Sequence, residues 1–310
     1  MPKHILLTET HHPHLLESLP SLPCTWTYVP KPTPDEVIAH LPKTHIWILR
    51  GAIPVTEALL THAPQLEAII RPGSGTDHID HMALKQRGIR LLTTPHANAA
   101  SVAEYVLTVL TLLARQIWPA AHAMQKGHWE RRTFLGHDVS TLTVGIIGFG
   151  HTGSQTAYRL AAAGAHVLAY DKYKGGFGGY GIEEVPLERL FAEATAVSFH
   201  VPLTPETRGW ANSRFWEAFH HPLYVVNAAR GELLSLPDLA KALKTGKVLG
   251  AALDVLPQEP PTSLAPEDRA ALEYLHIHPH VLLTPHIAGL THESEYRLAA
   301  ATLTLLRTLL

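Results

Sequence analysis

Three residues with complementary chemistry occupy equivalent places along the chain. Arg230, Glu259 and His286 each come shortly after an apolar run, at 223–227, 248–253 and 281–284. Removing a hydride from the carbon of a secondary alcohol yields a carbonyl only if the hydroxyl proton also leaves, so the reaction needs a base that titrates near neutrality. His286 is the candidate base, Glu259 would raise its pKa and hold its ring in one tautomer, and Arg230 would bind a substrate carboxylate through its planar fork.

Each of these residues also has an ordinary structural interpretation. His286 could be a loop histidine at a helix start, Glu259 a surface acid beside a proline, and Arg230 a cation at a strand end. The chain holds 23 histidines, so a histidine near a motif indicates little by itself. The catalytic interpretation is favoured because all three follow apolar strands, and open α/β sheets bind ligands beyond the carboxyl ends of their strands.

A glycine-rich turn predicts a dinucleotide site. Gly148, Gly150 and Gly153 follow the apolar run 144–147 and open a helix that we expect to end at Ala163. The first glycine permits a tight turn, the second lets a pyrophosphate approach the backbone, and the third allows close helix packing. Glycines at this spacing also occur in plain turns, so the preceding strand and following helix are what favour the binding function.

Asp171 ends the next apolar run and favours NAD as the cofactor. It lies about twenty residues after the glycines, where a carboxylate can bind both ribose hydroxyls and repel a 2′-phosphate. Lys172 and Lys174 lie close by and could reach toward a phosphate, but a solvated loop edge is the favoured interpretation of both lysines. NAD is therefore predicted rather than NADP.

Apolar runs alternate with helix-like segments, which predicts parallel α/β sheets. The expected strands are 5–7, 46–49, 66–70 and 89–92 in the first part, then 144–147, 166–170, 196–200, 223–227, 248–253 and 281–284. Short helices are expected at 56–62 and 82–87. Ser101 and Glu104 have capping-box spacing ahead of a long apolar helix, and Thr291 could cap the last helix. The glycine tract 175–181 is expected to be a flexible surface loop.

Composition excludes several classes of protein. A chain of 310 residues, 46% hydrophobic and 17% charged, fits two globular domains. A net charge of −2 gives no basic field, so no nucleic-acid partner is expected. The most apolar stretch, 102–117, carries Glu104 and Arg115, so we expect a buried helix and no membrane association. With Cys24 as the single cysteine, a reducing cytoplasm is expected, and no metal site is predicted.

The motifs together resemble the D-isomer-specific 2-hydroxyacid dehydrogenase family over nearly the whole chain. The segments that carry the resemblance are 73–80, 98–104, 148–153, 200–204, 227–231 and 284–286. The resemblance implies an NAD-dependent dehydrogenase of a small 2-hydroxy or 2-keto acid, with Arg230, Glu259 and His286 as catalytic residues. It implies a Rossmann NAD-binding domain, 99–286, inserted in a flavodoxin-like substrate domain, 1–98 plus 287–310. A homodimer, built partly by the helix after Ser101, is also implied.

The resemblance further implies a set of binding residues. Ser74 and Gly75 would contact the substrate carboxylate through backbone amides. The cofactor would be contacted by residues of the glycine turn and the strand ends, namely Gly148, Gly150, His151, Thr152, Gly153, Asp171, His200, Val201, Pro202, Thr207, Ala228, Asp254 and Gly289. Two departures stand out, since His78 occupies a place where the family usually has asparagine and the glycine tract is unlike the usual adenosine-side loop.

Within the family, segments 113–117 and 127–134 are similar to 3-phosphoglycerate dehydrogenase. That likeness implies 3-phosphoglycerate, a precursor of serine, as substrate, in a short form without a regulatory domain. Arg50 and Arg71 follow expected strands and could bind the phosphate. Arg131 or Arg132 could arrive from a partner subunit.

Other interpretations remain open at this point. Arg71 could pair with a structural carboxylate, and Arg131 and Arg132 could be surface residues of a dimer arm. Hydroxypyruvate or glyoxylate reduction would use the same catalytic residues on an unphosphorylated acid. A protein of another class, a non-enzymatic NAD-sensing corepressor, could also use this fold. Glutamate rather than glutamine at position 259 argues against formate oxidation.

Overall fold

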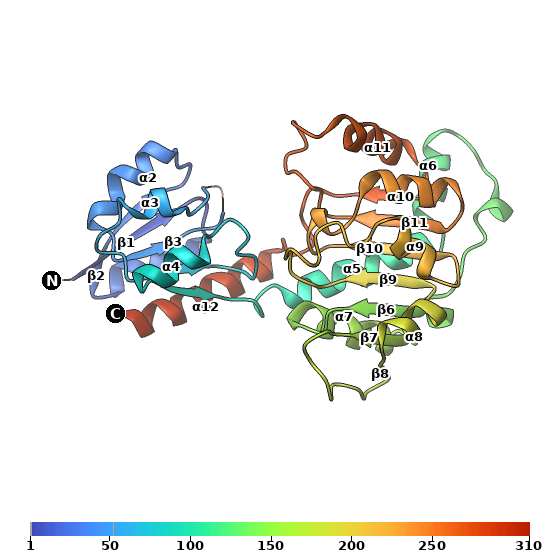
Figure 1. The fold of residues 1–310 in the computed structure, drawn as a ribbon, viewed down its shortest axis with the longest axis horizontal. Coiled ribbons are helices and arrows are strands. Elements are labelled where there is room, and N and C mark those ends of the chain that lie inside the picture. Colours follow the sequence, from blue (N-terminus) through green and yellow to red (C-terminus); the bar gives the residue numbers. More distant parts are fainter. Residues whose placement is uncertain (1, 52) are drawn as a thin grey trace. The chain divides into compact units, whose positions relative to one another are not determined.

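The computed structural model describes residues 2–51 and 53–310, which form two compact units (Figure 1). One unit runs to Asn98 and takes up the C-terminal segment Leu290–Leu310, and the other is Ala99–Gly289. The expected domain boundary after residue 286 falls in the same loop as the boundary after Gly289. Each unit is an open parallel sheet with helices on both faces, so the predicted fold class is confirmed.

The first unit has a five-stranded sheet in the flavodoxin-like order β2-β1-β3-β4-β5. Its strands are β1 Lys3–Thr8, β2 Cys24–Val29, β3 Ile46–Ile48, β4 Ala68–Arg71 and β5 Arg90–Thr93. Its helices are α1 Pro13–Ser18, α2 Pro34–His40, α3 Glu57–Leu60, α4 His81–Arg87 and α12 His292–Leu309, with 3₁₀ turns η1 Leu19–Ser21 and η2 Leu41–Lys43.

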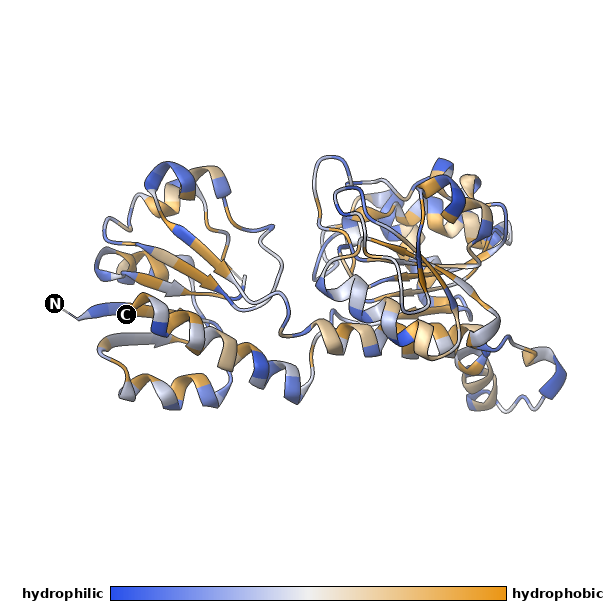
Figure 2. Cartoon of the chain, turned by 90° about the horizontal axis from the view of Figure 1, so that it is seen from below, coloured by the Kyte–Doolittle hydropathy of each residue, from blue (hydrophilic) through white to orange (hydrophobic). Residues whose placement is uncertain are grey.

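The alternation of side chains along β1 explains why helices cover both faces of this sheet. Successive residues of a strand point to opposite faces. Ile5 and Leu7 pack in one apolar cluster with α1 and α12, whereas Leu6 packs in the other with α2, α3 and α4. Figure 2 shows the resulting pattern, with apolar residues concentrated along the strands. As predicted, Thr291 caps α12, and it forms a reciprocal capping box with Ser294.

The second unit has a seven-stranded sheet in the order β12-β11-β10-β9-β6-β7-β8. Its strands are β6 Thr143–Ile147, β7 His166–Tyr170, β8 Ile182–Glu184, β9 Ala196–Phe199, β10 Leu223–Asn227, β11 Val248–Leu253 and β12 Val281–Leu283. Its helices are α5 Ala99–Ala114, α6 Ile117–Gln125, α7 His151–Ala162, α8 Leu187–Glu193, α9 Ser213–Ala218, α10 Leu236–Lys244 and α11 Pro266–Ile277, with 3₁₀ turns η3 Arg131–Phe134, η4 Val139–Thr141 and η5 Gly231–Leu233.

This strand order places the glycine turn where a dinucleotide site is expected. Counted within the unit, the order is 3-2-1-4-5-6-7, the doubly wound arrangement with one extra strand. The order reverses between β6 and β9, and the glycine turn follows β6 directly. Helices α5 and α7 cover one face of the sheet, and α8 to α11 cover the other. Because the strands are parallel, their carboxyl ends lie at one edge of the sheet.

Two strands were not foreseen from the sequence. β2 is an edge strand with no fully buried residue and alternating threonines, so it lacks the continuous apolar run of a central strand. β8 has only three residues and directly follows the glycine tract, of which Gly175, Gly176, Gly178, Gly179 and Gly181 are exposed. Correcting the prediction of six strands, the second sheet has seven.

The predicted capping box at the start of the long apolar helix is wrong. Helix α5 begins at Ala99, so Ser101 and Glu104 lie inside its first turns rather than at its cap. Ser101 is 8% exposed, and Ala99 and Val102 beside it are buried as well. A cap at Ser101 would leave Ala99 outside the helix, but burial of this turn stabilises the helix from Ala99 onward.

No single helix among the described residues is long and apolar enough to cross a membrane. Helices α5 and α6 are long and apolar enough to span a membrane only when their lengths are combined, and they are bent by 65° at the break between them. The residues of α5 that give it its apolar character are largely buried inside the second unit.

We predict that buried His11 makes the fold less stable in acid. Burial and the nearby charge of Arg50 lower the pKa of His11 to about 4, although the Thr8 carbonyl, 3.0 Å from its Nε2, opposes the shift. The unfolded chain then binds the proton first, so stability is lost as the pH falls from about 6.5 toward 4. A difference of this size corresponds to about 3 kcal/mol.

Denaturant unfolding at a series of pH values measures this effect. His11→Gln should flatten the dependence of the unfolding free energy on pH between 6.5 and 4. The same substitution at exposed His62 serves as a matched control. Equal slopes for the unmutated chain and His11→Gln would contradict the prediction.

Candidate active site

A short hydrogen bond joins His286 to Glu259. His286 Nδ1 lies 2.5 Å from Glu259 Oε2, although the two residues are 27 positions apart in the sequence. The other carboxylate oxygen accepts a hydrogen bond of 3.0 Å from the backbone amide of Leu256, which fixes the orientation of the acid. With Nδ1 directed at the carboxylate, Nε2 is the ring nitrogen left to exchange a proton with a substrate.

The buried carboxylate of Asp254 holds the loop that carries His286. Asp254 is 1% exposed and follows β11. Its Oδ1 accepts hydrogen bonds from the amide of Ile287 at 2.8 Å and from the Thr284 hydroxyl at 2.6 Å, and its Oδ2 accepts one from the amide of Ala288 at 2.7 Å. The turn so formed gives His286 a φ of 56°, in the left-handed region. Such a conformation persists only where surrounding contacts hold it.

Tyr105 supports the same loop from α5. Its hydroxyl lies 2.6 Å from Thr284 Oγ1. Because the Thr284 hydroxyl donates its proton to Asp254, Tyr105 is the donor in this bond. Burial raises the pKa of Tyr105 to about 12, so the phenol keeps that proton. Tyr105 is a positioning residue that sequence reasoning missed.

Arg230 lies on the loop that follows β10. Asn227, at the end of this strand, accepts the amide of Ala229 at 3.1 Å and donates to the Arg230 carbonyl at 2.8 Å. Gly231 then contacts the loop that leads to Glu259, since a Cβ at this position would meet the Leu256 carbonyl carbon at 1.9 Å. Only glycine permits this approach, and it brings the Arg230 loop against the Glu259 loop.

The electrostatics show that all three predicted catalytic residues act on one another. The hydrogen bond that His286 donates to Glu259 raises the pKa of His286 above its usual value, against the opposing effects of burial and of Arg230. Partial burial raises the pKa of Glu259, but hydrogen bonds from His286 and Leu256 and the charge of Arg230 bring it below its usual value. An imidazole whose pKa is raised by a carboxylate can exchange a proton with a bound molecule. A fixed cation beside the pair can hold an anion at the same time.

The glycine turn after β6 fits a dinucleotide. Gly148 has a φ of 96°, and a Cβ there would meet the His200 carbonyl at 2.7 Å. At Gly153 a Cβ would meet the Gly148 carbonyl oxygen at 1.9 Å, so this glycine lets α7 pack against the turn. At Gly150, which precedes the first turn of α7, a Cβ would meet nothing within 4 Å. That space beside a helix N-terminus suits a pyrophosphate.

Asp171 occupies the end of β7 and is tied to the glycine turn. Its Oδ2 accepts the amide of Phe149 at 2.7 Å, and its Oδ1 accepts the amides of Tyr173 and Lys174 at 2.9 and 3.1 Å. Lys174 donates to the Phe149 carbonyl at 3.1 Å. The loop that begins at Asp171 is therefore bonded to the turn that would receive the cofactor.

Lys172 and the glycine tract 175–181 each contact other residues of the second unit. Lys172 forms an ion pair of 2.5 Å with Glu206. Phe177, inside the glycine tract, stacks on Phe149 with ring centroids 4.2 Å apart. Both lysines thus have partners within this unit, and the ring stack ties the glycine tract to the glycine turn.

The structure brings further predicted cofactor residues together around His200. Its Nε2 lies 2.9 Å from Ser198 Oγ, and its Nδ1 lies 3.3 Å from Thr152 Oγ1 in the first turn of α7. Burial lowers the pKa of His200 to about 3, so the ring is neutral. Val201 and Pro202 follow it, and Thr207 donates to the Pro202 carbonyl at 2.8 Å.

The remaining predicted cofactor residues lie at the same sheet edge of the second unit. Ala228 follows β10, Gly289 ends the loop of His286, and His151 begins α7. Asp254 uses both carboxylate oxygens within the protein, so its observed role is to position the His286 loop.

The predicted substrate residues follow strands of the first unit. Ser74 and Gly75 lie in the loop after β4, where the Gly73 amide donates to Thr94 Oγ1 at 2.7 Å. The ring of His78 lies against Gly51, since a Cβ on that glycine would meet the ring at 3.2 Å. Gly51 thus leaves room for the histidine ring at position 78, which is larger than the asparagine usual in the family.

The two arginines predicted to bind phosphate differ in their surroundings. Arg71 folds back onto its own loop, with Nη1 donating to the Pro72 carbonyl at 2.8 Å and lying against Gly73. Arg50, after β3, forms a bidentate pair with Glu295 of α12. Glu295 was not foreseen, because no local signal links residues 245 positions apart. Arg131 and Arg132 are exposed on η3.

Comparison with known proteins identifies the family. The model of the D-isomer specific 2-hydroxyacid dehydrogenase family, NAD binding domain, matches residues 107–288. The chain belongs to this family. The matched segment contains the glycine turn, Asp171 and the three residues of the candidate catalytic centre, and NAD is the cofactor of the domain that it describes.

Members of the family with different substrates are similar to the chain. D-3-phosphoglycerate dehydrogenase of Homo sapiens is 34% identical over 265 residues, which cover 85% of the chain and 48% of the human enzyme. Hydroxypyruvate reductase of Thermotoga maritima is 35% identical over 263 residues, covering 85% and 84%. The chain thus spans about half the length of the phosphoglycerate dehydrogenases that it matches.

A solved structure of the family shares the fold. D-lactate dehydrogenase of Aquifex aeolicus, complexed with NAD and lactic acid, superposes with a TM-score of 0.88 and 26% identity, covering 98% of the chain and 95% of that enzyme. The resemblance seen in the sequence motifs is therefore confirmed at the level of the family.

We predict that the charge of Asp171 sets the preference between NAD and NADP. Asp171→Asn removes the charge that repels a 2′-phosphate and keeps one oxygen that can accept the amides of Tyr173 and Lys174, although its NH2 group cannot accept the amide of Phe149. The ratio of the dissociation constants for NADPH and NADH should fall by about tenfold or more. Titration of cofactor fluorescence measures both constants, with Glu188→Gln on an exposed turn as control. An unchanged ratio would assign the preference to another group.

Proposed function

We propose that the protein is an NAD-dependent oxidoreductase that interconverts a D-2-hydroxy acid and the corresponding 2-keto acid. The observation that carries the proposal is the 2.5 Å bond between His286 and Glu259, with Arg230 close enough for its charge to act on both. These groups lie at the same edge of the sheet as the glycine turn that suits NAD.

Each residue has a distinct role in the proposed reaction. His286 Nε2 takes the hydroxyl proton during oxidation and returns it to the carbonyl oxygen during reduction. Glu259 keeps the ring oriented and stabilises the imidazolium. Arg230 binds the substrate carboxylate and, through its fixed charge, polarises the carbonyl oxygen. Bound NAD supplies the acceptor for the hydride.

Two substrates are compatible with this chemistry, and they differ by a phosphoryl group. Identity of 34% to the human phosphoglycerate dehydrogenase and the presence of Arg50 and Arg71 support 3-phosphoglycerate. The Thermotoga hydroxypyruvate reductase, which the chain matches over most of its length, supports hydroxypyruvate or glyoxylate. The non-enzymatic corepressor is disfavoured, because a cofactor sensor has no need of a base paired to an acid.

A homodimer is part of the proposal. The segment from α6 to residue 136 carries exposed apolar side chains, with Trp129 75% and Leu135 87% exposed and Ile117 and Met124 about half exposed. A cluster of large exposed apolar side chains is a common mark of a protein interface. Arg131 and Arg132 lie on the same segment, as a partner's contribution would require.

We predict that His286→Ala abolishes turnover without loss of cofactor binding. The substitution removes the proton acceptor but leaves the glycine turn and Asp171 intact, so kcat should fall by about a thousandfold or more while the dissociation constant for NADH changes little. Rates with hydroxypyruvate, glyoxylate, pyruvate and 3-phosphohydroxypyruvate measure the effect. Turnover at the unmutated rate would remove His286 as the base.

We predict that Glu259→Gln moves the pH profile to lower pH. The hydrogen bond to the Glu259 carboxylate raises the pKa of His286, so a neutral amide at position 259 lets that pKa fall. Oxidation needs the neutral ring of His286 as a base, and this form then appears at lower pH. Reduction needs the protonated ring as an acid, and this form is then lost at lower pH. The midpoint of kcat/KM for reduction should shift to lower pH. An unmoved midpoint would show that Glu259 does not control the base.

A further inference from the structure

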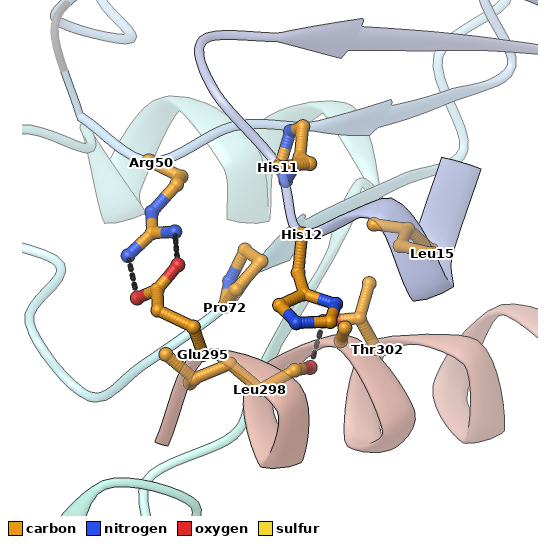
Figure 3. Close-up of a pocket in the computed structure, with 9 residues that line it drawn as sticks. His11, His12, Leu15, Arg50, Pro72, Glu295, Leu298 and Thr302 are labelled. Atoms are coloured by element: carbon orange, nitrogen blue, oxygen red, sulfur yellow. Dashed lines mark hydrogen bonds and ion pairs between the residues drawn. The ribbon is translucent and has the colours of Figure 1, made fainter. Parts of the chain in front are cut away.

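A small pocket at the carboxyl edge of the first sheet is lined by Arg50 and the carboxylate of Glu295, and the carboxylate of Glu9 holds the backbone of Arg50. Arg50 follows β3, and Glu295 extends from the first turn of α12 (Figure 3). Glu9 follows β1. Arg50 Nη1 and Nη2 lie 2.5 and 2.7 Å from the two oxygens of Glu295. Glu9 Oε2 accepts the backbone amides of Arg50 and Gly51.

The pair of Arg50 and Glu295 is partly withdrawn from water. The two side chains are 29% and 22% exposed. The hydrogen bonds to Glu295 raise the pKa of Arg50, and those from Arg50 lower the pKa of Glu295. Both groups are therefore charged over the physiological range. A bidentate pair of this kind uses the face of the guanidinium fork that would otherwise receive a phosphate.

The charge balance around Arg50 is unfavourable for a second anion. Glu9 and Glu295 contribute carboxylates, and Arg50 contributes one cation. His11 and His12 also line the pocket. Burial lowers the pKa of His11 to about 4, so its ring is neutral, and His12 contributes a positive charge near Glu295 only when it is protonated. A phosphoryl group would have to displace Glu295 and then lie beside a half-buried carboxylate without its partner, which is a costly arrangement.

We propose that Glu295 is a specificity-determining residue that excludes a phosphoryl group from Arg50, so that the substrate is an unphosphorylated 2-hydroxy acid. This inference rests on the proposed function and decides between its two substrates. The group that excludes a wrong substrate is as much a part of specificity as the groups that bind the right one. In this structure the Arg71 guanidinium donates to the Pro72 carbonyl at 2.8 Å and lies against Gly73.

Competing kinetics on the unmutated protein give the first test. With NADH as reductant, kcat/KM for hydroxypyruvate should exceed that for 3-phosphohydroxypyruvate by about tenfold or more, with most of the difference in KM. A preference for the phosphorylated acid would overturn the proposal. This measurement needs no variant, so it stands even if a substitution disturbs folding.

The substitution Glu295→Gln gives the second test. It removes the carboxylate charge and leaves a side chain of the same shape, so the ratio of the two kcat/KM values should move by about tenfold toward the phosphorylated acid. Glu293→Gln, on the exposed side of the same helix turn, is the matched control and should leave the ratio unchanged. The double variant Arg50→Gln with Glu295→Gln should lose the gain. A ratio that stays the same in folded Glu295→Gln would overturn the proposal.

Inorganic phosphate separates this proposal from the proposed function. If the protein turns over none of the acids, the dehydrogenase proposal fails, but calorimetry with phosphate still tests the role of Glu295. Glu295→Gln should bind phosphate at least about tenfold more tightly than the unmutated chain, and Arg50→Gln should abolish that binding. Equal phosphate binding by the unmutated chain and Glu295→Gln would count against the exclusion of anions by Glu295.

Discussion

The buried carboxylate of Asp254 is the constraint on which the candidate catalytic centre depends. Its two oxygens receive two backbone amides and one hydroxyl from the loop after β12, and that loop can then bring His286 to Glu259 in a left-handed turn. A buried carboxylate without such donors would be strongly unfavourable, so the loop and the acid hold each other in place. The 2.5 Å bond between His286 and Glu259 is a consequence of this arrangement.

Much of the fold could be predicted from the sequence because its signals are local. The apolar runs of the buried strands, the glycine turn after β6 and Thr291 as a helix cap each reflect the physical needs of neighbouring residues. The edge strands β2 and β8 lack such a signal, since neither is buried enough to require a continuous apolar run. The start of α5 was missed for the opposite reason, because burial overrode a local cap pattern.

The candidate site was only partly predictable. Arg230, Glu259 and His286 could be found because each follows a strand, and strand ends converge at one edge of a parallel sheet. Tyr105 and Glu295 could not be found in this way, since each acts through a partner on a distant segment. Arg50 shows the limit most clearly. Its type and place suggested an anion site, whereas its charge is already matched by an acid of the last helix.

The contact of Gly231 with the Leu256 carbonyl limits how this site can change. Any side chain at position 231 would force apart the two loops that carry Arg230 and Glu259, so in the proposed mechanism anion binding and proton transfer would be coupled through this position. Libraries built to broaden the range of accepted acids should therefore keep position 231 fixed.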